Sequence, residues 1–340
     1  MPVIESRDTE PRRPVMRAVL HERYGRPDVL ELRDVDKPAT ADDRVLVRVH
    51  ASSVNPVEWY GVSGPYFARF GNGMRRPKDQ TVGADLAGTV EAVGKDVESL
   101  RPGDDVFGVS GASWAEYTLA REDRLAKKPV NLTFEEAAAV PVAGVTALQA
   151  LRDKGRVEPG QKVLVNGASG GVGTFAVQLA KAFGADVTAV CSTGNVEQAR
   201  SLGADRVVDY TKEDFTTLGP EHDLMLDIAG SRSFLDFRKA LRPDATVVLV
   251  GGRMTYRGLG PLPHLGGTIL KSRFRSQTVT FFVAQVTAED LAFLAGLLEA
   301  GTLRAVIDRT YELSRAPDAL AYLGEGHAKA KVVIDCNGSA

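Results

Sequence analysis

The feature that most constrains the fold is the stretch VLVNGASGGVGTFAVQLA at residues 163–180. An apolar run of strand length enters a turn of small residues, and a segment with helical spacing of apolar residues follows at once. The first amide groups of such a helix have no intrahelical acceptor, and they carry the positive end of the helix dipole. The turn is therefore suited to bind a diphosphate, in a fold that leads a strand directly into a helix.

The small residues of this turn are spaced as in the dinucleotide fingerprint Gly-x-Gly-x-x-Gly. Ala168 stands at the first glycine position, and Gly170 and Gly173 stand at the second and third. The alanine makes the match to the motif less specific. A glycine-rich turn can also serve only to pack a helix closely on a strand. The strand before it, the helix after it and a second strand ending near Cys191 favour the nucleotide. The residues predicted to bind the cofactor here are Ala168, Ser169, Gly170, Gly171, Val172 and Gly173.

Two patterns divide the chain, whose 340 residues predict two domains. Between about residues 135 and 283, strand-sized runs alternate with helix-sized segments, as in KVLVNG, DVTAVC, RVVDY, LMLDIAG and TVVLVGG. This alternation predicts an α/β fold with a doubly wound parallel sheet. From residue 16 to about 125, short runs such as RVLVRVHASSV predict an irregular β-rich domain. The last segment, KAKVVIDC, is a strand that could join either sheet.

Composition excludes several classes of protein. A net charge of −2 gives no reason to expect nucleic acid or a membrane as the main partner. Two cysteines, Cys191 and Cys336, are too few for a disulfide framework and favour a reducing, cytoplasmic location. Residues 1–15 contain acidic side chains and no apolar core, so we expect a disordered tail rather than a targeting peptide.

The stretch VTAVCSTGN at residues 187–195 lacks the acid that commonly follows the second strand of a dinucleotide fold. Such an acid binds the ribose 2'-hydroxyl and would repel a 2'-phosphate. Ser192 and Thr193 offer hydroxyl groups instead, which favours NADPH over NADH, with Tyr210 and a base such as Arg200 in support. The alternative is that Ser192 and Thr193 only cap the next helix.

With this loop, GADLAGTVEAVG before it and GHAKAKVVI after it, the chain resembles the medium-chain dehydrogenase/reductase superfamily. It is most similar to the zinc-free quinone oxidoreductase branch, from Met16 to Asp335. The resemblance implies a β-rich, GroES-like catalytic barrel domain formed by residues 16–137 and 303–340. It also implies a Rossmann-type NADP-binding domain at residues 138–302, with a cleft between the two. A homodimer joined through the edge strand TVTFFVAQV is implied as well.

Departures from the zinc branch of the superfamily indicate the chemistry. The zinc enzymes have a cysteine and a His-Glu pair where this chain has SVNPVEWY and GADLAG, so no metal is expected and Asp85 is interpreted as structural. Without a Lewis acid, a simple alcohol cannot readily be polarised. The substrate must already be electrophilic, which predicts hydride transfer from NADPH to quinones or α,β-unsaturated carbonyls.

The resemblance also assigns individual residues. Asn55 and Tyr60 match residues beside the nicotinamide and substrate, and Tyr60 could hydrogen-bond the carbonyl oxygen and donate a proton. The alternative for Tyr60 is an aromatic wall with Trp59. The quinone reductases usually place a base just after the second strand, where this chain has Gly194 or Asn195. Further predicted cofactor contacts are Ala143, Thr146, Asn195, Gly251, Gly252, Phe281, Phe282, Val283 and Lys331.

Some alternatives remain open on the sequence. The segment at residues 253–276, which includes His264, could be a lid over the substrate cleft or a solvated surface loop. An enoyl-thioester reductase would need the same hydride geometry with a longer groove. A structural or RNA-associated protein that binds NADPH with little catalysis is the alternative from another class.

Overall fold

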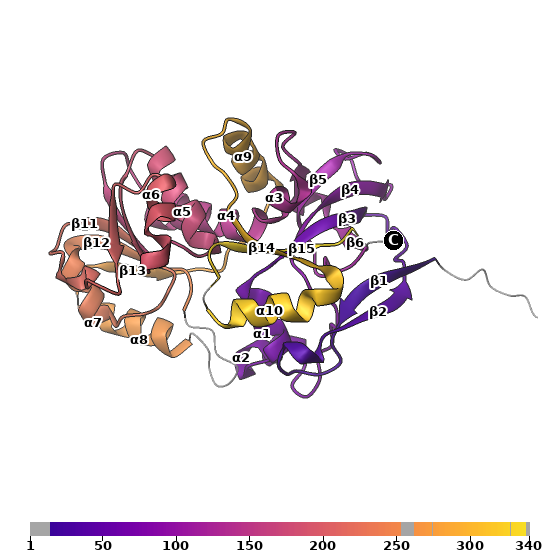
Figure 1. Cartoon of the computed structure of the whole chain (residues 1–340), viewed down its shortest axis with the longest axis horizontal. Helices are drawn as coiled ribbons and strands as arrows, with labels where there is room; N and C mark the ends of the chain where they lie inside the picture. The colour runs from indigo at the N-terminus through magenta and orange to yellow at the C-terminus, as the bar shows by residue number, and fades with distance from the viewer. Residues whose placement is uncertain (1–13, 253–261, 274, 327, 338–340) are drawn as a thin grey trace, which may run out of the picture.

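The computed structural model describes residues 14–252, 262–273, 275–326 and 328–337 (Figure 1). Within these residues one sheet has six parallel strands in the order β10-β9-β8-β11-β12-β13. The order reverses between β8 and β11, and in doubly wound sheets ligands bind at the carboxyl ends of the strands beside such a reversal. The strands are β8 (Lys162–Asn166), β9 (Asp186–Cys191), β10 (Arg206–Asp209), β11 (His222–Asp227), β12 (Leu241–Leu249) and β13 (Thr278–Phe281).

Helices connect the parallel strands, as the alternating pattern predicts. After β8, α5 begins directly at Gly171, and its apolar residues are buried along nearly its whole length. This burial explains the continuous apolar runs of the neighbouring strands, which are covered on both faces. The helices of this half are α4 (Pro141–Gln149), α5 (Gly171–Ala182), α6 (Val196–Ser201), α7 (Phe234–Phe237), α8 (Leu262–Ser272) and α9 (Ala288–Glu299).

The second large sheet of the described chain has the order β14-β15-β3-β4-β5-β7, with β6 paired to β3. The last strand therefore returns to the N-terminal sheet, where it pairs antiparallel with β3. A separate hairpin joins β1 (Val15–Leu20) and β2 (Glu31–Asp36). The strands of the sheet are β3 (Val45–Val54), β4 (Asp85–Val93), β5 (Asp105–Val109), β6 (Tyr117–Ala120), β7 (Leu125–Lys127), β14 (Ile307–Glu312) and β15 (Lys331–Asp335). Its helices are α1 (Pro56–Ser63), α2 (Tyr66–Asn72), α3 (Phe134–Ala138) and α10 (Ala316–Gly324).

The two sheets share a hydrophobic core. One cluster of buried side chains contains Ala51 and Phe107 from the N-terminal sheet together with Val163 and Val165 from β8. Helices α3 and α4, which lie between the sheets in Figure 1, contribute a run of buried alanines and valines to this cluster. The two halves are thus packed firmly enough to hold side chains from both in one site. No helix in the described residues is long and apolar enough to cross a membrane.

Candidate active site

The glycine-rich turn lies at the carboxyl end of β8, the central strand at the reversal of strand order. Its first part is tied to β9, because the Ala168 amide donates to the carbonyl oxygen of Val190 at 3.0 Å. A Cβ on Gly173 would lie 2.1 Å from the carbonyl oxygen of Gly167, so only glycine lets α5 pack on the turn. A Cβ on Gly170 would come no closer than 3.9 Å to another residue, and this backbone is open to approach. The turn therefore fits a nucleotide diphosphate.

The C-terminal segment lies against this turn. Ala330 forms a parallel β-bridge with Gly170, and a Cβ on Gly171 would lie 2.9 Å from Cδ of Lys331. Ala330 has a φ of +91°, a conformation that favours glycine, so its backbone is strained where it meets the turn. Lys331 is thus brought to the glycine-rich turn by contacts between the two halves of the molecule.

The ammonium group of Lys331 belongs to a buried polar network. Its Nζ lies 3.1 Å from Oδ2 of Asp85 and donates a 2.5 Å hydrogen bond to Oδ1 of Asn55. The Asn55 amide nitrogen donates in turn to Asp85 Oδ2 at 2.9 Å. All three residues are at most 3 % exposed. The side-chain oxygen and nitrogen of Asn55 therefore both bond to the ion pair. The aliphatic part of the lysine, rather than its ammonium group, faces the glycine turn.

Asp85 connects four elements of the structure. Besides its β15 partner Lys331, it accepts hydrogen bonds from the Ser53 hydroxyl of β3 and from the Val142 amide of α4, at 2.5 Å and 2.8 Å. An isolated carboxylate in such a buried place would be costly, and these donors offset the loss of hydration. Asp85 thus fixes α4 and β15 to β3 and β4, at the boundary of the two sheets.

Glu58 is a buried carboxyl that the sequence analysis missed. It is the third residue of α1 and forms a capping box with Asn55, whose backbone amide donates to Oε2 at 2.7 Å. Oε1 accepts a second hydrogen bond from the Ala84 amide at 2.8 Å. Burial, and then the charge of Asp85, raise the pKa of Glu58 to about 7. The spacing Asn-Pro-Val-Glu was the available signal, because an acid three residues after an N-cap residue is typical of a capping box.

Tyr60 lies on α1, two residues beyond Glu58. Its half-buried ring packs edge to face against Phe67, with ring centroids 5.3 Å apart. Burial raises the pKa of the Tyr60 hydroxyl, which favours the protonated, hydrogen-bond-donating form. Trp59 is buried against Gly324 of α10, where a Cβ would overlap the indole ring. Tyr60 and Trp59 thus have different packing partners.

The turn after β9 contains two of the hydroxyl groups assigned to a 2'-phosphate. The Thr193 hydroxyl donates to Oδ2 of Asp209 at 2.7 Å, and this bond is the largest cause that lowers the Asp209 pKa to about 2. The Ser192 hydroxyl oxygen accepts from the Asn195 side chain at 3.0 Å, which leaves the Ser192 proton available. Ser192 stands at the N-cap position of the helical turn Thr193–Asn195, but its side chain makes no capping hydrogen bond.

Tyr210 and Arg200, the two residues named in support of a 2'-phosphate, differ in whether their side chains are available to bind one. The Tyr210 amide donates to the Cys191 carbonyl at 3.0 Å, which fixes Tyr210 beside the turn with 56 % of its surface exposed. Arg200 is paired with Glu197 on the same helix at 2.6 Å, so its charge is already compensated. Of the two residues named in support of a phosphate, only Tyr210 is therefore placed beside the turn without a competing ion pair.

Comparison with known proteins decides the family. Residues 41–130 match the alcohol dehydrogenase GroES-like domain, and residues 202–334 match the zinc-binding dehydrogenase family. The chain is 37% identical to a 2-methylene-furan-3-one reductase of Solanum lycopersicum, over 94% of this chain and 79% of that protein. It belongs to the medium-chain dehydrogenase/reductase superfamily. The cofactor of this oxidoreductase is accordingly a nicotinamide nucleotide, which the open turn at Gly170 fits.

Two further relatives of this medium-chain reductase are informative. An NADPH-dependent alkenal/one oxidoreductase of Arabidopsis thaliana is 34% identical over 94% of this chain and 79% of that protein. The solved quinone oxidoreductase from Coxiella burnetii superposes with a TM-score of 0.81 and 29% identity, over 95% of this chain and 99% of that one. The GroES-like and Rossmann-type fold expected from the sequence is thereby confirmed.

For the zinc implied by one family description, the segments SVNPVEWY and GADLAG offer no histidine or cysteine ligand. Asn55, in the first of these segments, instead donates to Asp85 and accepts from Lys331. Across the parts of the chain that the structure describes, no three histidine, cysteine, aspartate or glutamate side chains are grouped to hold a metal ion. The protein's own cation, Lys331, lies beside the Asn55 amide instead.

The residues assigned to the nicotinamide end come from several elements of the reductase. Ala143 is buried and Thr146 partly buried on α4, whose N-terminal Val142 amide contacts Asp85. Gly251 and Gly252 follow β12, and the Gly251 amide donates to the Asp227 carbonyl at the end of β11. Phe281 ends β13. Its neighbour Phe282 packs against the shared core, whereas the side chain of Val283 is exposed.

The segment considered as a lid is only partly described. Residues 253–261 and residue 274 lie outside the described residues. The remainder contains α8, which is fixed to the sheet because His264 Nε2 lies 3.0 Å from Oδ2 of Asp227. The Asn166 amide donates to the other oxygen of Asp227 at 2.8 Å. Residues 262–272 therefore form a helix rather than a loop, and His264 bonds this helix to the carboxyl end of β11.

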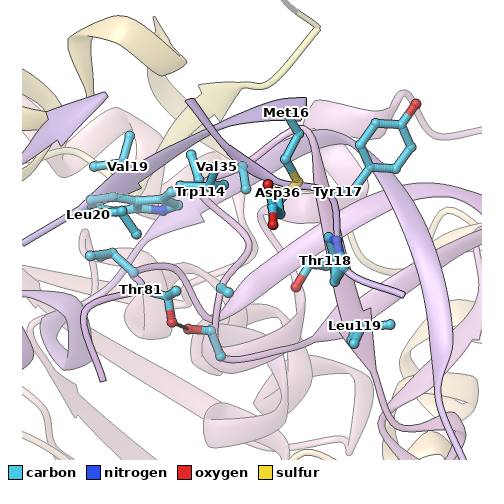
Figure 2. Close-up of a pocket in the computed structure, with 16 residues that line it drawn as sticks. Met16, Val19, Leu20, Val35, Asp36, Thr81, Trp114, Tyr117, Thr118 and Leu119 are labelled. Atoms are coloured by element: carbon cyan, nitrogen blue, oxygen red, sulfur yellow. Dashed lines mark hydrogen bonds between the residues drawn. The ribbon is translucent and has the colours of Figure 1, made fainter. Parts of the chain in front are cut away.

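A separate apolar pocket of about 390 Å³ lies between the β1–β2 hairpin and β6. Figure 2 shows Met16, Val35 and Trp114 among the side chains that line it. Asp36 provides the carboxylate of this lining, and none of the site residues described above contributes to it. The pocket lacks the groups needed for hydride transfer, so the candidate active site of this reductase is the region around the glycine turn and the Lys331 network.

Proposed function

We propose that this chain is an NADPH-dependent reductase that transfers hydride to quinones or α,β-unsaturated carbonyls without zinc. The observation that carries the proposal is the buried Lys331–Asp85–Asn55 network, which joins SVNPVEWY and GADLAG, the two segments without histidine or cysteine. With no Lewis acid to activate an alcohol, the favoured substrate is one whose carbonyl system already accepts hydride. The activities for which the Solanum and Arabidopsis relatives are named support this substrate class.

In this proposal the α5 amides, Tyr60 and the Lys331 network have separate roles. When bound, the nicotinamide nucleotide supplies the hydride. The amides that open α5 hold its diphosphate, and the bare Gly170 backbone permits the close approach. The Tyr60 hydroxyl donates a hydrogen bond to the substrate oxygen, where negative charge develops as hydride reaches the conjugated carbon. The Lys331 network keeps α1 and α4 in register, and Asn55 acts as a positioning residue.

The same proposal includes the remaining properties of the protein. The proposed division into residues 16–137 with 303–340 and residues 138–302 is supported by the separation of the strands into two sheets. A homodimer would use β13, the edge of the parallel sheet, where Phe281 is 41 % exposed. A cytoplasmic location is supported by two cysteines that are both free and buried.

The decisive experiment is steady-state oxidation of NADPH and of NADH with 1,4-benzoquinone, 9,10-phenanthrenequinone, an enone and an enoyl thioester, each with and without a chelator. We expect turnover of quinones or the enone that prefers NADPH and survives chelation. Loss of activity on chelation would overturn the zinc-free mechanism. Turnover of the thioester alone would favour the enoyl reductase, and NADPH binding without any turnover would favour a non-catalytic protein.

Replacing Tyr60 by phenylalanine tests the proposed hydrogen bond to the substrate. We expect kcat to fall about ten-fold, the value of one neutral hydrogen bond, with little change in the KM for NADPH. Because burial raises the Tyr60 pKa above its ordinary value near 10, the wild-type rate should show no loss of this donor below about pH 10. Tyr117→Phe, in the separate apolar pocket, is the matched control. An unchanged kcat in Tyr60→Phe would mean that the ring serves only as packing.

A further inference from the structure

A lysine from the C-terminal segment lies over the turn that follows β9. Gly194 in this turn has no side chain, and a Cβ built there would lie 3.7 Å from Nζ of Lys329. The two residues come from different halves of the molecule, since Lys329 precedes β15 of the N-terminal sheet. The C-terminal segment therefore supplies a positive charge at the end of the second strand of the parallel sheet.

The backbone of Lys329 is fixed while its side chain is not tied down. The Lys329 amide donates to Oδ2 of Asp308 at 2.8 Å, and the same oxygen accepts from the Tyr322 hydroxyl at 2.7 Å. Lys329 itself is exposed. Within the described residues, no carboxylate lies within 4.0 Å of its ammonium group, in contrast to Lys212, which is paired with Asp209 at 3.3 Å. Lys329 is thus held at the turn with an uncompensated charge.

The other charged side chains around the turn are paired with one another, and Lys329 supplies the remaining positive charge. Asp209 is balanced by Lys212 and accepts from the Thr193 and Thr211 hydroxyls. Arg200 is balanced by Glu197. The Ser192 hydroxyl proton and the exposed Tyr210 side chain complete the surroundings with neutral hydrogen-bonding groups. A dianionic group at this turn would therefore meet one cation and hydroxyl donors.

We propose that Lys329 is the cation that recognises the 2'-phosphate of NADPH. It replaces the base that relatives place just after the second strand, where this chain has Gly194 and Asn195. A Cβ at position 194 would be in ordinary van der Waals contact with the ammonium, so the ammonium lies directly over this backbone. Lysine acts on phosphate as a flexible point charge and can bind from a distant segment, provided that its backbone is anchored. This inference rests on the proposed use of NADPH and names the residue that determines it.

The test compares dissociation constants of NADPH and NADH, measured by quenching of protein fluorescence, in wild type, Lys329→Ala and Lys329→Arg. We expect Lys329→Ala to weaken NADPH binding about ten-fold, the lower range for a charged hydrogen bond, and to leave NADH binding unchanged. Lys329→Arg should keep most of the NADPH affinity. Lys239→Ala, which removes an equal charge from an exposed lysine paired with Asp236, is the control and should change neither constant.

The outcomes separate this inference from the proposed function. If wild type prefers NADPH and Lys329→Ala retains that preference, Lys329 is not the phosphate cation, although the proposed cofactor stands. If Lys329→Ala weakens both cofactors equally, the lysine acts on the fold or the diphosphate, and the inference fails. A wild type that binds NADH as well as NADPH would overturn the cofactor proposal itself, and with it the role of Lys329. Competition by 2'-AMP against 5'-AMP gives an independent readout, because we expect only the former to lose affinity in Lys329→Ala.

Discussion

Replacing Lys331 by methionine is expected to lower the free energy of unfolding by about 3 kcal/mol, the lower range for breaking a buried ion pair. The methionine keeps the length of the stem beside Gly171 but leaves the Asp85 carboxylate without its cation. Asp85 is fully buried, so water cannot replace the lost charge. Urea unfolding followed by circular dichroism measures the change.

The double variant Asp85→Asn with Lys331→Met is the control for this prediction. With no carboxylate left to bury, the double variant should be more stable than Lys331→Met alone, because the unpaired charge and not the missing lysine causes most of the loss. An equal free energy of unfolding for Lys331→Met and wild type would show that Ser53, Asn55 and Val142 already satisfy Asp85. The network would then contribute little to stability.

A second large effect is expected from Gly170→Ala, which should weaken binding of the nicotinamide nucleotide roughly hundred-fold. A methyl group here has no close neighbour in the protein, since the nearest atom lies 3.9 Å away. It would instead stand where the diphosphate meets the α5 amides, and the loss of one or two charged hydrogen bonds has this magnitude. The thermal unfolding midpoint of the variant without cofactor should match that of wild type.

Gly173→Ala provides the contrast, because its Cβ would lie 2.1 Å from the Gly167 carbonyl oxygen. We expect this variant to unfold at lower urea concentration even without cofactor, since backbone atoms must move apart. Fluorescence titration with NADPH and urea unfolding of both variants distinguish the two roles. Normal binding by Gly170→Ala would place the diphosphate elsewhere, and a stable Gly173→Ala would contradict the tight packing of α5.

Local patterns predicted the parallel sheet and its glycine turn because strand, turn and helix are adjacent in the sequence. The partner sheet of β15 could not be predicted in this way, since its pairing with β3 joins residues nearly the whole chain apart. The side-chain network could not be predicted for the same reason. Asp85 was interpreted as structural and Lys331 was expected at the cofactor, but the ion pair between them was not foreseen.

The turn after β9 shows a different limit of sequence reasoning. The sequence has no acid after the second strand, where one would bind the ribose. In the structure, Asp209 reaches the same turn from the end of the third strand and accepts a hydrogen bond from Thr193. A base for the 2'-phosphate was likewise sought near the second strand, whereas the proposed base, Lys329, comes from the other half of the molecule. Charges that act through space cannot be ranked from their order in the chain, because folding decides which are already compensated.

The place of β15 between β14 and β3 determines the order in which the two sheets can be completed during synthesis. The parallel sheet has all of its described strands once residue 281 has left the ribosome. The N-terminal sheet must wait for β15, which pairs directly with β3. The half that is translated second is therefore the first that can finish folding, and Asp85 remains without its cation until Lys331 emerges.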